Sequence, residues 1–182
     1  MPYSLVPLIR DFIPSLGEPR QQVLWVGCSD SDFEETTTLD LLPDEIITLR
    51  NIGNMFLESG LTCLSMVQYA INVLQVQHII VCGHYGCNLV RASSNAGLGD
   101  PWRSKLNTVR YACENKLDDL PEEQRDGRFV ELNVLAQMLF LRSYPEVASA
   151  VENRDLKIHG VVYDRSRKGA VRLVADLERH DS

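Results

Sequence analysis

Residues that can bind a soft metal ion stand at two places in the chain. Cys28 follows one short apolar run, and His84 and Cys87 follow another. Two thiolates and one imidazole are the protein ligands of one type of catalytic zinc site, which keeps its fourth position open. The sequence therefore predicts that Cys28, His84 and Cys87 bind Zn²⁺. Asp30, two residues after Cys28, places a carboxylate close to this ligand set.

The two apolar runs are predicted strands. Val23–Gly27 and His78–Gly83 are short and apolar, and each ends in glycine, as is typical of buried strands. In open α/β sheets, ligands bind beyond the carboxyl ends of the strands. Cys28 and His84 each come directly after such an end, so we expect the two strands to be neighbours.

The rest of the chain predicts an α/β fold. We expect further strands at Glu45–Leu49, Ile158–Tyr163 and Ala170–Ala175, and helices over residues 61–76, 102–117, 129–141 and 145–153. The last two strands form a hairpin, so the sheet is mixed, with a parallel centre, an antiparallel edge hairpin and helices on both faces. We expect residues 1–182 to form a single domain, in which residues 1–20 are an N-terminal arm or helix.

The composition excludes several classes of protein. The chain has 182 residues, of which 45% are hydrophobic, which suits one globular domain. A net charge of −7 gives no electrostatic footing for nucleic-acid binding. No apolar run approaches the roughly 18–20 residues of a membrane span, and the first residues lack a signal-peptide pattern. Five cysteines without framework spacing favour a reducing compartment, so we expect a cytoplasmic protein.

Four segments together resemble the β-class carbonic anhydrases, most closely their short fungal and bacterial members. These segments are Leu24–Ser31, Leu49–Asn54, Ile79–His84 with Cys87, and Ile158–Asp164. The resemblance implies a zinc enzyme that reversibly hydrates carbon dioxide to bicarbonate and a proton. It also implies an α/β fold and assembly as a homodimer or a multiple of dimers, with CO₂ and bicarbonate as the small-molecule partners.

The same resemblance implies roles for four residues. Cys28, His84 and Cys87 are the three fixed zinc ligands. Asp30 is the catalytic aspartate of the family, which either binds zinc in a closed site or turns away to admit water. Zinc hydration chemistry requires the open state, because water must lose a proton near neutral pH to become the nucleophile.

Two positions depart from the family pattern. Asp32 stands where the family has an arginine that pairs with the aspartate, and Asn88 stands where the family usually has glycine. At roughly 6 Å and an effective dielectric of about 20, two unit charges interact by ~3 kcal/mol. Loss of the arginine therefore favours the closed state, in which Asp30 binds zinc. We accordingly expect weak activity. Two alternatives bear on this: Arg50 could replace the missing cation, and Asn88 could crowd the pocket or hydrogen-bond to Asp30.

Two other functions remain open on the sequence alone. One is a non-catalytic or regulatory protein of the same fold, with zinc in a closed structural site. The other is hydrolysis of a molecule similar to CO₂, such as carbonyl sulfide or carbon disulfide. The remaining thiols and strand imidazoles are interpreted as packing residues rather than ligands: Cys63, Cys82, Cys113, His78 and His159.

Overall fold

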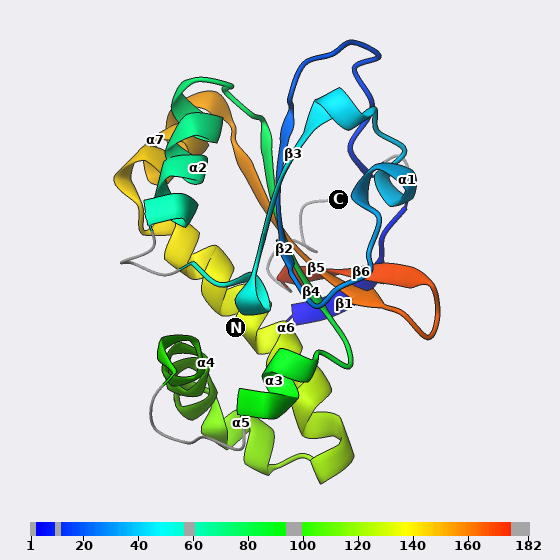
Figure 1. Cartoon of the computed structure of the whole chain (residues 1–182), viewed down its shortest axis with the longest axis vertical. Coiled ribbons are helices and arrows are strands. Elements are labelled where there is room, and N and C mark those ends of the chain that lie inside the picture. Colours follow the sequence, from blue (N-terminus) through cyan, green and yellow to red (C-terminus); the bar gives the residue numbers. More distant parts are fainter. Residues whose placement is uncertain (1–2, 10–11, 57–60, 94–99, 176–182) are drawn as a thin grey trace.

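The predicted parallel strands lie at the centre of a six-stranded sheet (Figure 1). The computed structural model describes residues 3–9, 12–56, 61–93 and 100–175. The first three parallel strands are β2 (Val23–Cys28), β3 (Ile46–Asn51) and β4 (His78–His84), of which β3 forms one edge of the sheet. β2 pairs in parallel with β3 on one side and with β4 on the other. The two strands that precede the candidate ligands are therefore neighbours, as predicted.

The antiparallel part of the sheet extends beyond β4. β5 (Lys157–Asp164) is parallel to β4, and β6 (Gly169–Ala175) pairs with β5 as the predicted hairpin. The sheet order is β1-β6-β5-β4-β2-β3, which confirms a mixed sheet with a parallel centre.

The expected N-terminal arm or helix differs from the structure in one respect. Residues Tyr3–Pro7 form an edge strand, β1, which pairs antiparallel with β6. Pro7 lacks a backbone N–H and is therefore tolerated in a strand at a sheet edge, as it is at the end of β1. Residues 1–2 and 10–11 of the predicted arm lie outside the described residues.

Helices cover both faces of the sheet, as predicted. They are α1 (Glu35–Leu39), α2 (Leu61–Asn72), α3 (Asn88–Ser93), α4 (Pro101–Ala112), α5 (Glu114–Asp118), α6 (Glu122–Arg142) and α7 (Pro145–Arg154), with short 3₁₀ turns at Pro43–Glu45 and Ile52–Asn54. The single helix expected over 102–117 is broken at Cys113, whose backbone leaves helical geometry. Helix α6 begins before the predicted Phe129, because its polar first turns also adopt helical structure.

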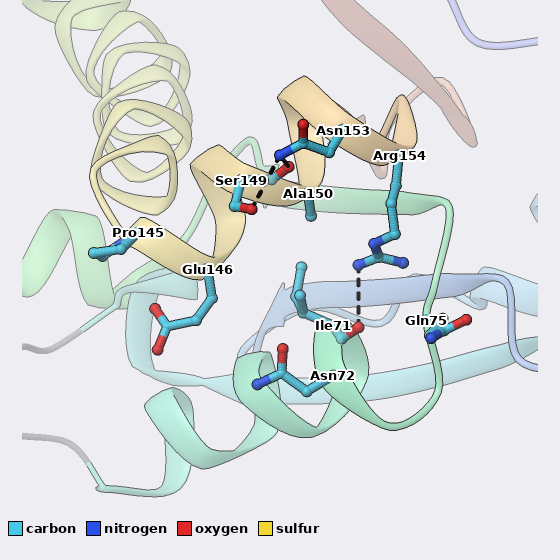
Figure 2. A pocket seen from close by; sticks show the side chains of 9 residues that line it. All are labelled: Ile71, Asn72, Gln75, Pro145, Glu146, Ser149, Ala150, Asn153 and Arg154. Carbon is cyan, nitrogen blue, oxygen red and sulfur yellow. Dashed lines mark hydrogen bonds between the residues drawn. The ribbon is translucent and has the colours of Figure 1, made fainter.

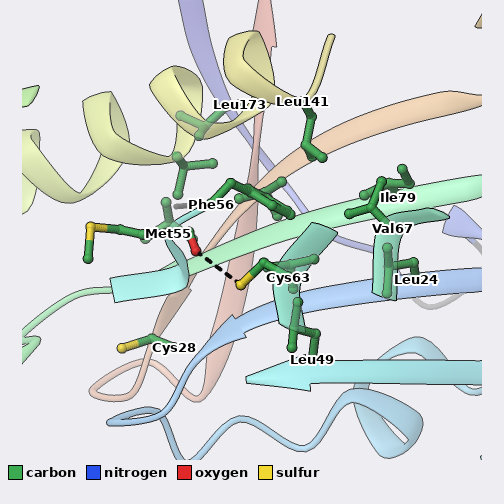
Figure 3. Close-up of a cluster of buried hydrophobic side chains, with 14 of the residues drawn as sticks. Leu24, Cys28, Leu49, Met55, Phe56, Cys63, Val67, Ile79, Leu141 and Leu173 are labelled. Atoms are coloured by element: carbon green, nitrogen blue, oxygen red, sulfur yellow. Dashed lines mark hydrogen bonds between the residues drawn. The ribbon is translucent and has the colours of Figure 1, made fainter. Parts of the chain in front are cut away.

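Alternating strand residues build two hydrophobic cores. Leu24 and Val26 of β2 pack into the cluster formed with α2, α6 and α7 (Figure 3). Val23 and Trp25 point to the opposite face and pack with Leu39 of α1. Figure 1 shows α2, α6 and α7 on one side of the sheet and α1 on the other. This period-two alternation is the geometry of a strand buried on both faces.

Helix α6 lies very close to strand β4 at Gly83. A Cβ at Gly83 would stand 2.9 Å from side-chain carbons of both Val130 and Val134. Only glycine permits this approach without displacing the helix. The residue before His84 therefore fixes the depth at which the end of β4 packs on α6.

A buried carboxylate, Glu45, fixes the segment that leads into β2. It accepts hydrogen bonds from Ser15 Oγ (2.7 Å), Gln22 Nε2 (3.1 Å), Leu42 N (2.8 Å) and Leu16 N. Burial opposes ionisation of Glu45, but these donors outweigh burial and hold the pKa of its carboxyl group below the ordinary value. The ionised form is therefore the one that stabilises the fold.

We expect Glu45→Gln to lower the free energy of unfolding at neutral pH by about 2 kcal/mol, the range for hydrogen bonds to a charged group. Because the pKa of Glu45 is lower in the folded state, its contribution is complete above the ordinary value of 4.5 and is lost as pH falls through the folded value. Urea unfolding across this range should show the two proteins converging in acid. Exposed Glu152→Gln is the control, and an equal deficit at every pH would contradict this role.

Candidate metal centre

The carboxyl ends of β2 and β4 bring the predicted ligands together. Gly27 is in register with Cys82, so Cys28, the last residue of β2, lies next to the end of β4. His84 is the last residue of β4. The chain then turns at Gly86, whose φ of 73° is the left-handed conformation that glycine adopts readily, and returns Cys87 to the same place.

The three side chains form one buried cluster. The ligand atoms of Cys28, His84 and Cys87 all lie within 4.8 Å of one another, and the two sulfur atoms are 3.8 Å apart. Within the described residues, His84 Nε2 is buried and has no hydrogen-bond partner. A buried unpartnered imidazole nitrogen beside two thiols matches the needs of zinc, which binds sulfur and nitrogen ligands. The residues present therefore fit the predicted metal.

The pKa values of the two thiols in the cluster are shifted in opposite directions. The hydrogen bond between the Cys28 and Cys87 sulfur atoms lowers the pKa of Cys28 to about 4, and His84 and the Asp30 N–H lower it further. The same hydrogen bond raises the pKa of Cys87, because it favours the protonated thiol, and burial raises it further. The pair is thus poised as one thiolate and one thiol, and Cys87 must release its proton when it binds a metal.

Asp30 lies beside the cluster and is held by Asn88. Its Oδ2 atom is 3.9 Å from His84 Nε2. The carboxylate accepts hydrogen bonds from the Asn88 main-chain N–H at 2.8 Å and from Asn88 Nδ2 at 3.3 Å. Of the two alternatives for Asn88, the structure supports the hydrogen bond to Asp30. The carboxylate of Asp30 is therefore hydrogen-bonded to the neutral Asn88 side chain. The family resemblance implies a charged arginine as the partner instead.

Arg50 has a different role from the one considered in the sequence analysis. Its guanidinium donates to the carbonyl oxygens of Cys28 (3.1 Å), Ser31 (2.8 Å) and Phe33, and it forms a salt bridge with Glu35 at 2.6 Å. These contacts commit Arg50 to the loop that follows β2, so the hypothesis that it replaces the missing cation at Asp30 is wrong. Instead, Arg50 holds the backbone of that loop in place. The sequence analysis considered Arg50 only as a partner of Asp30. Its position at the end of β3, the strand next to β2, is what indicates a role in holding the loop after β2.

Asp32 is exposed and has a partner outside the cluster. Its side chain is 52% exposed and pairs with Arg165 Nε at 2.9 Å. Solvent screening and this partner both weaken its repulsion of Asp30. The departure at this position therefore acts mainly through the absence of a cation, and less through the presence of a second carboxylate.

The other cysteines and strand histidines are packing residues, as predicted. Cys63 and Cys82 are buried in the two hydrophobic cores, and burial raises the pKa of Cys82. Cys113 packs against the first core. His78 and His159 hydrogen-bond to each other at 3.1 Å near the amino ends of β4 and β5, away from the ligand cluster.

A surface pocket also lies away from the cluster. It is about 600 Å³ in volume and is lined by residues of α2 and α7 and by Gln75, near the amino end of β4 (Figure 2). Arg154 donates a hydrogen bond to the Ile71 carbonyl oxygen across it at 3.1 Å. The metal-type residues gather at the other end of β4, so this pocket is not part of the candidate site.

Comparisons with known proteins agree with this geometry. The sequence model of the carbonic anhydrase family matches residues 23–171. A carbonic anhydrase of Candida albicans is 35% identical over 150 residues, which are 78% of this chain and 52% of the relative. The β-class carbonic anhydrase CafD of Aspergillus fumigatus is 42% identical, with a TM-score of 0.83 over 94% of this chain and 100% of that one. The chain belongs to the β-class carbonic anhydrase family.

The chain covers only part of the length of some of its relatives. The chain spans 52% of the C. albicans enzyme and 65% of a carbonic anhydrase of Emericella nidulans, but 79% of one from Pseudomonas aeruginosa. All three predicted ligands fall inside the residues that match the family. Within the part of the chain that the structure describes, no helix is long and apolar enough to cross a membrane.

Proposed function

We propose that this chain catalyses the zinc-dependent, reversible hydration of carbon dioxide to bicarbonate and a proton, and that it does so slowly. The observation that carries the proposal is the buried cluster of Cys28, His84 and Cys87, with an unpartnered imidazole nitrogen between two thiols. Zinc bound there supplies Lewis-acid chemistry that lowers the pKa of water toward neutrality and makes it a nucleophile.

The surrounding residues orient this site. Cys28 and His84 lie on strand ends that are fixed by the sheet, and Arg50 holds the backbone after Cys28. Such preorganisation favours tight metal binding, because little backbone ordering has to accompany it. Asp30 stands next to this ligand set, with its Oδ2 atom 3.9 Å from His84 Nε2.

The low rate follows from the partner of Asp30. Hydrogen bonds between neutral donors and a carboxylate are weaker than those in a bidentate arginine pair, which adds a second charge. Asn88 therefore fixes the Asp30 carboxylate, which lies 3.9 Å from His84 Nε2, less firmly than an arginine partner would. A carboxylate held this loosely would compete with water for the open position of a zinc ion bound by Cys28, His84 and Cys87.

The experiment that tests the proposal compares substrates on the zinc-loaded protein. Stopped-flow CO₂ hydration should exceed that of the metal-free protein at neutral and mildly alkaline pH. Hydrolysis of carbonyl sulfide should not exceed its metal-free control. Fast carbonyl sulfide hydrolysis would instead favour a hydrolase, and no excess rate on either substrate would favour a non-catalytic zinc protein.

We also propose that the chain assembles as a dimer or a multiple of dimers in the cytoplasm. Five free cysteines support a reducing compartment. Two β-class relatives from Sordaria macrospora are described as tetrameric. Leu5 and Ile9, in and after the edge strand β1, are 45% and 64% exposed, and we propose that they pack against a partner chain.

Sedimentation velocity at micromolar concentration should therefore show a dimer or larger species. Replacing Leu5 and Ile9 together by aspartate should shift the protein toward the monomer, because charge disfavours an apolar contact. Leu139→Asp, at a residue of α6 with 66% exposure, is the matched control. A wild-type protein that sediments as a compact 20.6 kDa monomer would contradict the assembly.

A further inference from the structure

A cluster of four polar side chains lies next to the turn from His84 to Cys87, called the metal loop below. None of the four belongs to the predicted ligand set. Its centre is Glu131 of helix α6, which is only 7% exposed. Tyr85 OH donates to Glu131 Oε1 at 2.7 Å, and Tyr3 OH donates to Glu131 Oε2 at 2.5 Å. Arg128 Nη1 donates to the same Oε2 at 3.0 Å and also to the Tyr3 hydroxyl. Both carboxylate oxygens are thus engaged.

This cluster joins three distant parts of the chain. Tyr3 lies on the edge strand β1, and Glu131 and Arg128 lie one turn apart on α6. Tyr85 stands between the ligands His84 and Cys87 in sequence. The Arg128 guanidinium also stacks over the ring of Tyr3 at 4.5 Å. The side chain of Tyr3 is therefore held from two directions by α6.

The cluster is built to remain in one protonation state. Burial and the hydrogen bond to Glu131 raise the pKa of the Tyr3 phenol, so its hydroxyl remains a donor at neutral pH. Arg128 balances the negative charge of Glu131. A buried carboxylate whose two oxygens are both satisfied favours a single geometry, since each alternative leaves a charge unpaired.

Tyr85 passes this geometry to the metal loop. Its main-chain N–H donates to the Tyr163 carbonyl oxygen of β5 at 2.9 Å, while its hydroxyl is fixed by Glu131. The turn from His84 to Cys87 is therefore anchored at its second residue by both backbone and side chain. The next residue, Gly86, adopts a left-handed φ of 73°, which glycine reaches readily.

We propose that Tyr3 and Glu131 are positioning residues for the metal loop: through Tyr85, they hold His84 and Cys87 in ligand geometry. The edge strand β1 thereby controls how long the site retains its metal. The inference rests on the proposed zinc site for its consequence, but the anchor itself is a property of the polypeptide.

Two measurements test the inference on the full-length chain. The first is amide hydrogen exchange on the metal-free protein, comparing wild type with Tyr3→Phe, Tyr85→Phe and Glu131→Gln. We expect all three variants to speed exchange across residues 84–88 by about fivefold, the factor that corresponds to one lost hydrogen bond. A merely structural role for Tyr3 would speed exchange only in β1 and β6.

The second measurement is the rate of zinc release to a chelator at a temperature where every variant is folded by circular dichroism. We expect each variant to release zinc about fivefold faster than wild type. The Tyr3→Phe, Tyr85→Phe double variant should be less than multiplicative, because both hydroxyls act through Glu131. Tyr111→Phe, at a residue 72% exposed on α4, is the control and should match wild type.

The inference is overturned if Tyr3→Phe leaves exchange at residues 84–88 unchanged, or if the two tyrosine effects multiply independently. Because exchange is measured without metal, it decides the anchor even for a chain that binds no zinc. A wild-type chain without zinc would contradict the proposed function alone.

Discussion

Replacing Cys87 by serine is expected to remove bound zinc from the protein and abolish CO₂ hydration. A serine hydroxyl is a poor zinc ligand compared with a thiolate, and its loss leaves only Cys28 and His84 of the buried cluster. Metal analysis after exhaustive dialysis should give close to one zinc per wild-type chain and almost none for Cys87→Ser.

Cys113→Ser is the matched control for this prediction. Cys113 is a free thiol outside the ligand cluster, so its replacement should leave both zinc content and hydration rate unchanged. Full retention of zinc by Cys87→Ser would sink the ligand assignment.

Restoring both family residues, by Asp32→Arg together with Asn88→Gly, should raise the hydration rate by about tenfold or more. A shift of ~1.4 kcal/mol between the open and closed states of Asp30 is a factor of ten in their populations. Asp32→Arg should contribute the larger part, because a guanidinium two residues from Asp30 offers the carboxylate a partner other than zinc. Arg165, which now pairs with Asp32, would repel the new arginine and favour its turn toward Asp30. Stopped-flow assays on the wild type, both single variants and the double variant measure the effect.

From these contacts, we expect Asp32→Arg and Asn88→Gly, each made alone, to change the hydration rate in opposite directions. Asn88→Gly removes the Nδ2 donor from Asp30, so by itself it should lower the rate. In the Asp32→Arg background it should be neutral or favourable, because the arginine then holds the carboxylate and the missing side chain leaves room for substrate. Asp32→Asn, which removes a charge without adding a cation, should change the rate little. A wild type that is already fast, or an inert Asp32→Arg with zinc retained, would contradict this account.

Most of the fold could be predicted from local patterns. Val23–Gly27 and His78–Gly83 are predictable because short apolar runs ended by glycine are typical of buried strands. The clustering of Cys28, His84 and Cys87 could be predicted because Cys28 and His84 stand at these ends, where parallel strands converge, and Cys87 follows shortly after. By contrast, Tyr3–Pro7 is too short and mixed to indicate a strand. Its conformation depends on pairing with β6, which is distant in sequence.

The contacts of the site's charged groups could not be predicted in the same way. Arg50 could pair with Asp30 on loop proximity alone, but the structure commits it to three carbonyl oxygens and Glu35. Whether Asn88 crowds or holds Asp30 depends on the turn at Gly86 that orients its backbone N–H. Such choices are set by side-chain direction in three dimensions, which residue spacing does not encode.

The most direct test of the central claim is a zinc titration of the metal-free protein followed by stopped-flow CO₂ hydration. Among the residues that the structure describes, one cluster of three metal-type side chains is present, so we expect the rate to rise linearly with added zinc and to stop rising at one equivalent. The plateau should be low in the wild type and higher in the Asp32→Arg variant. A protein that takes up one zinc per chain without any gain in rate would contradict the account and identify the site as structural.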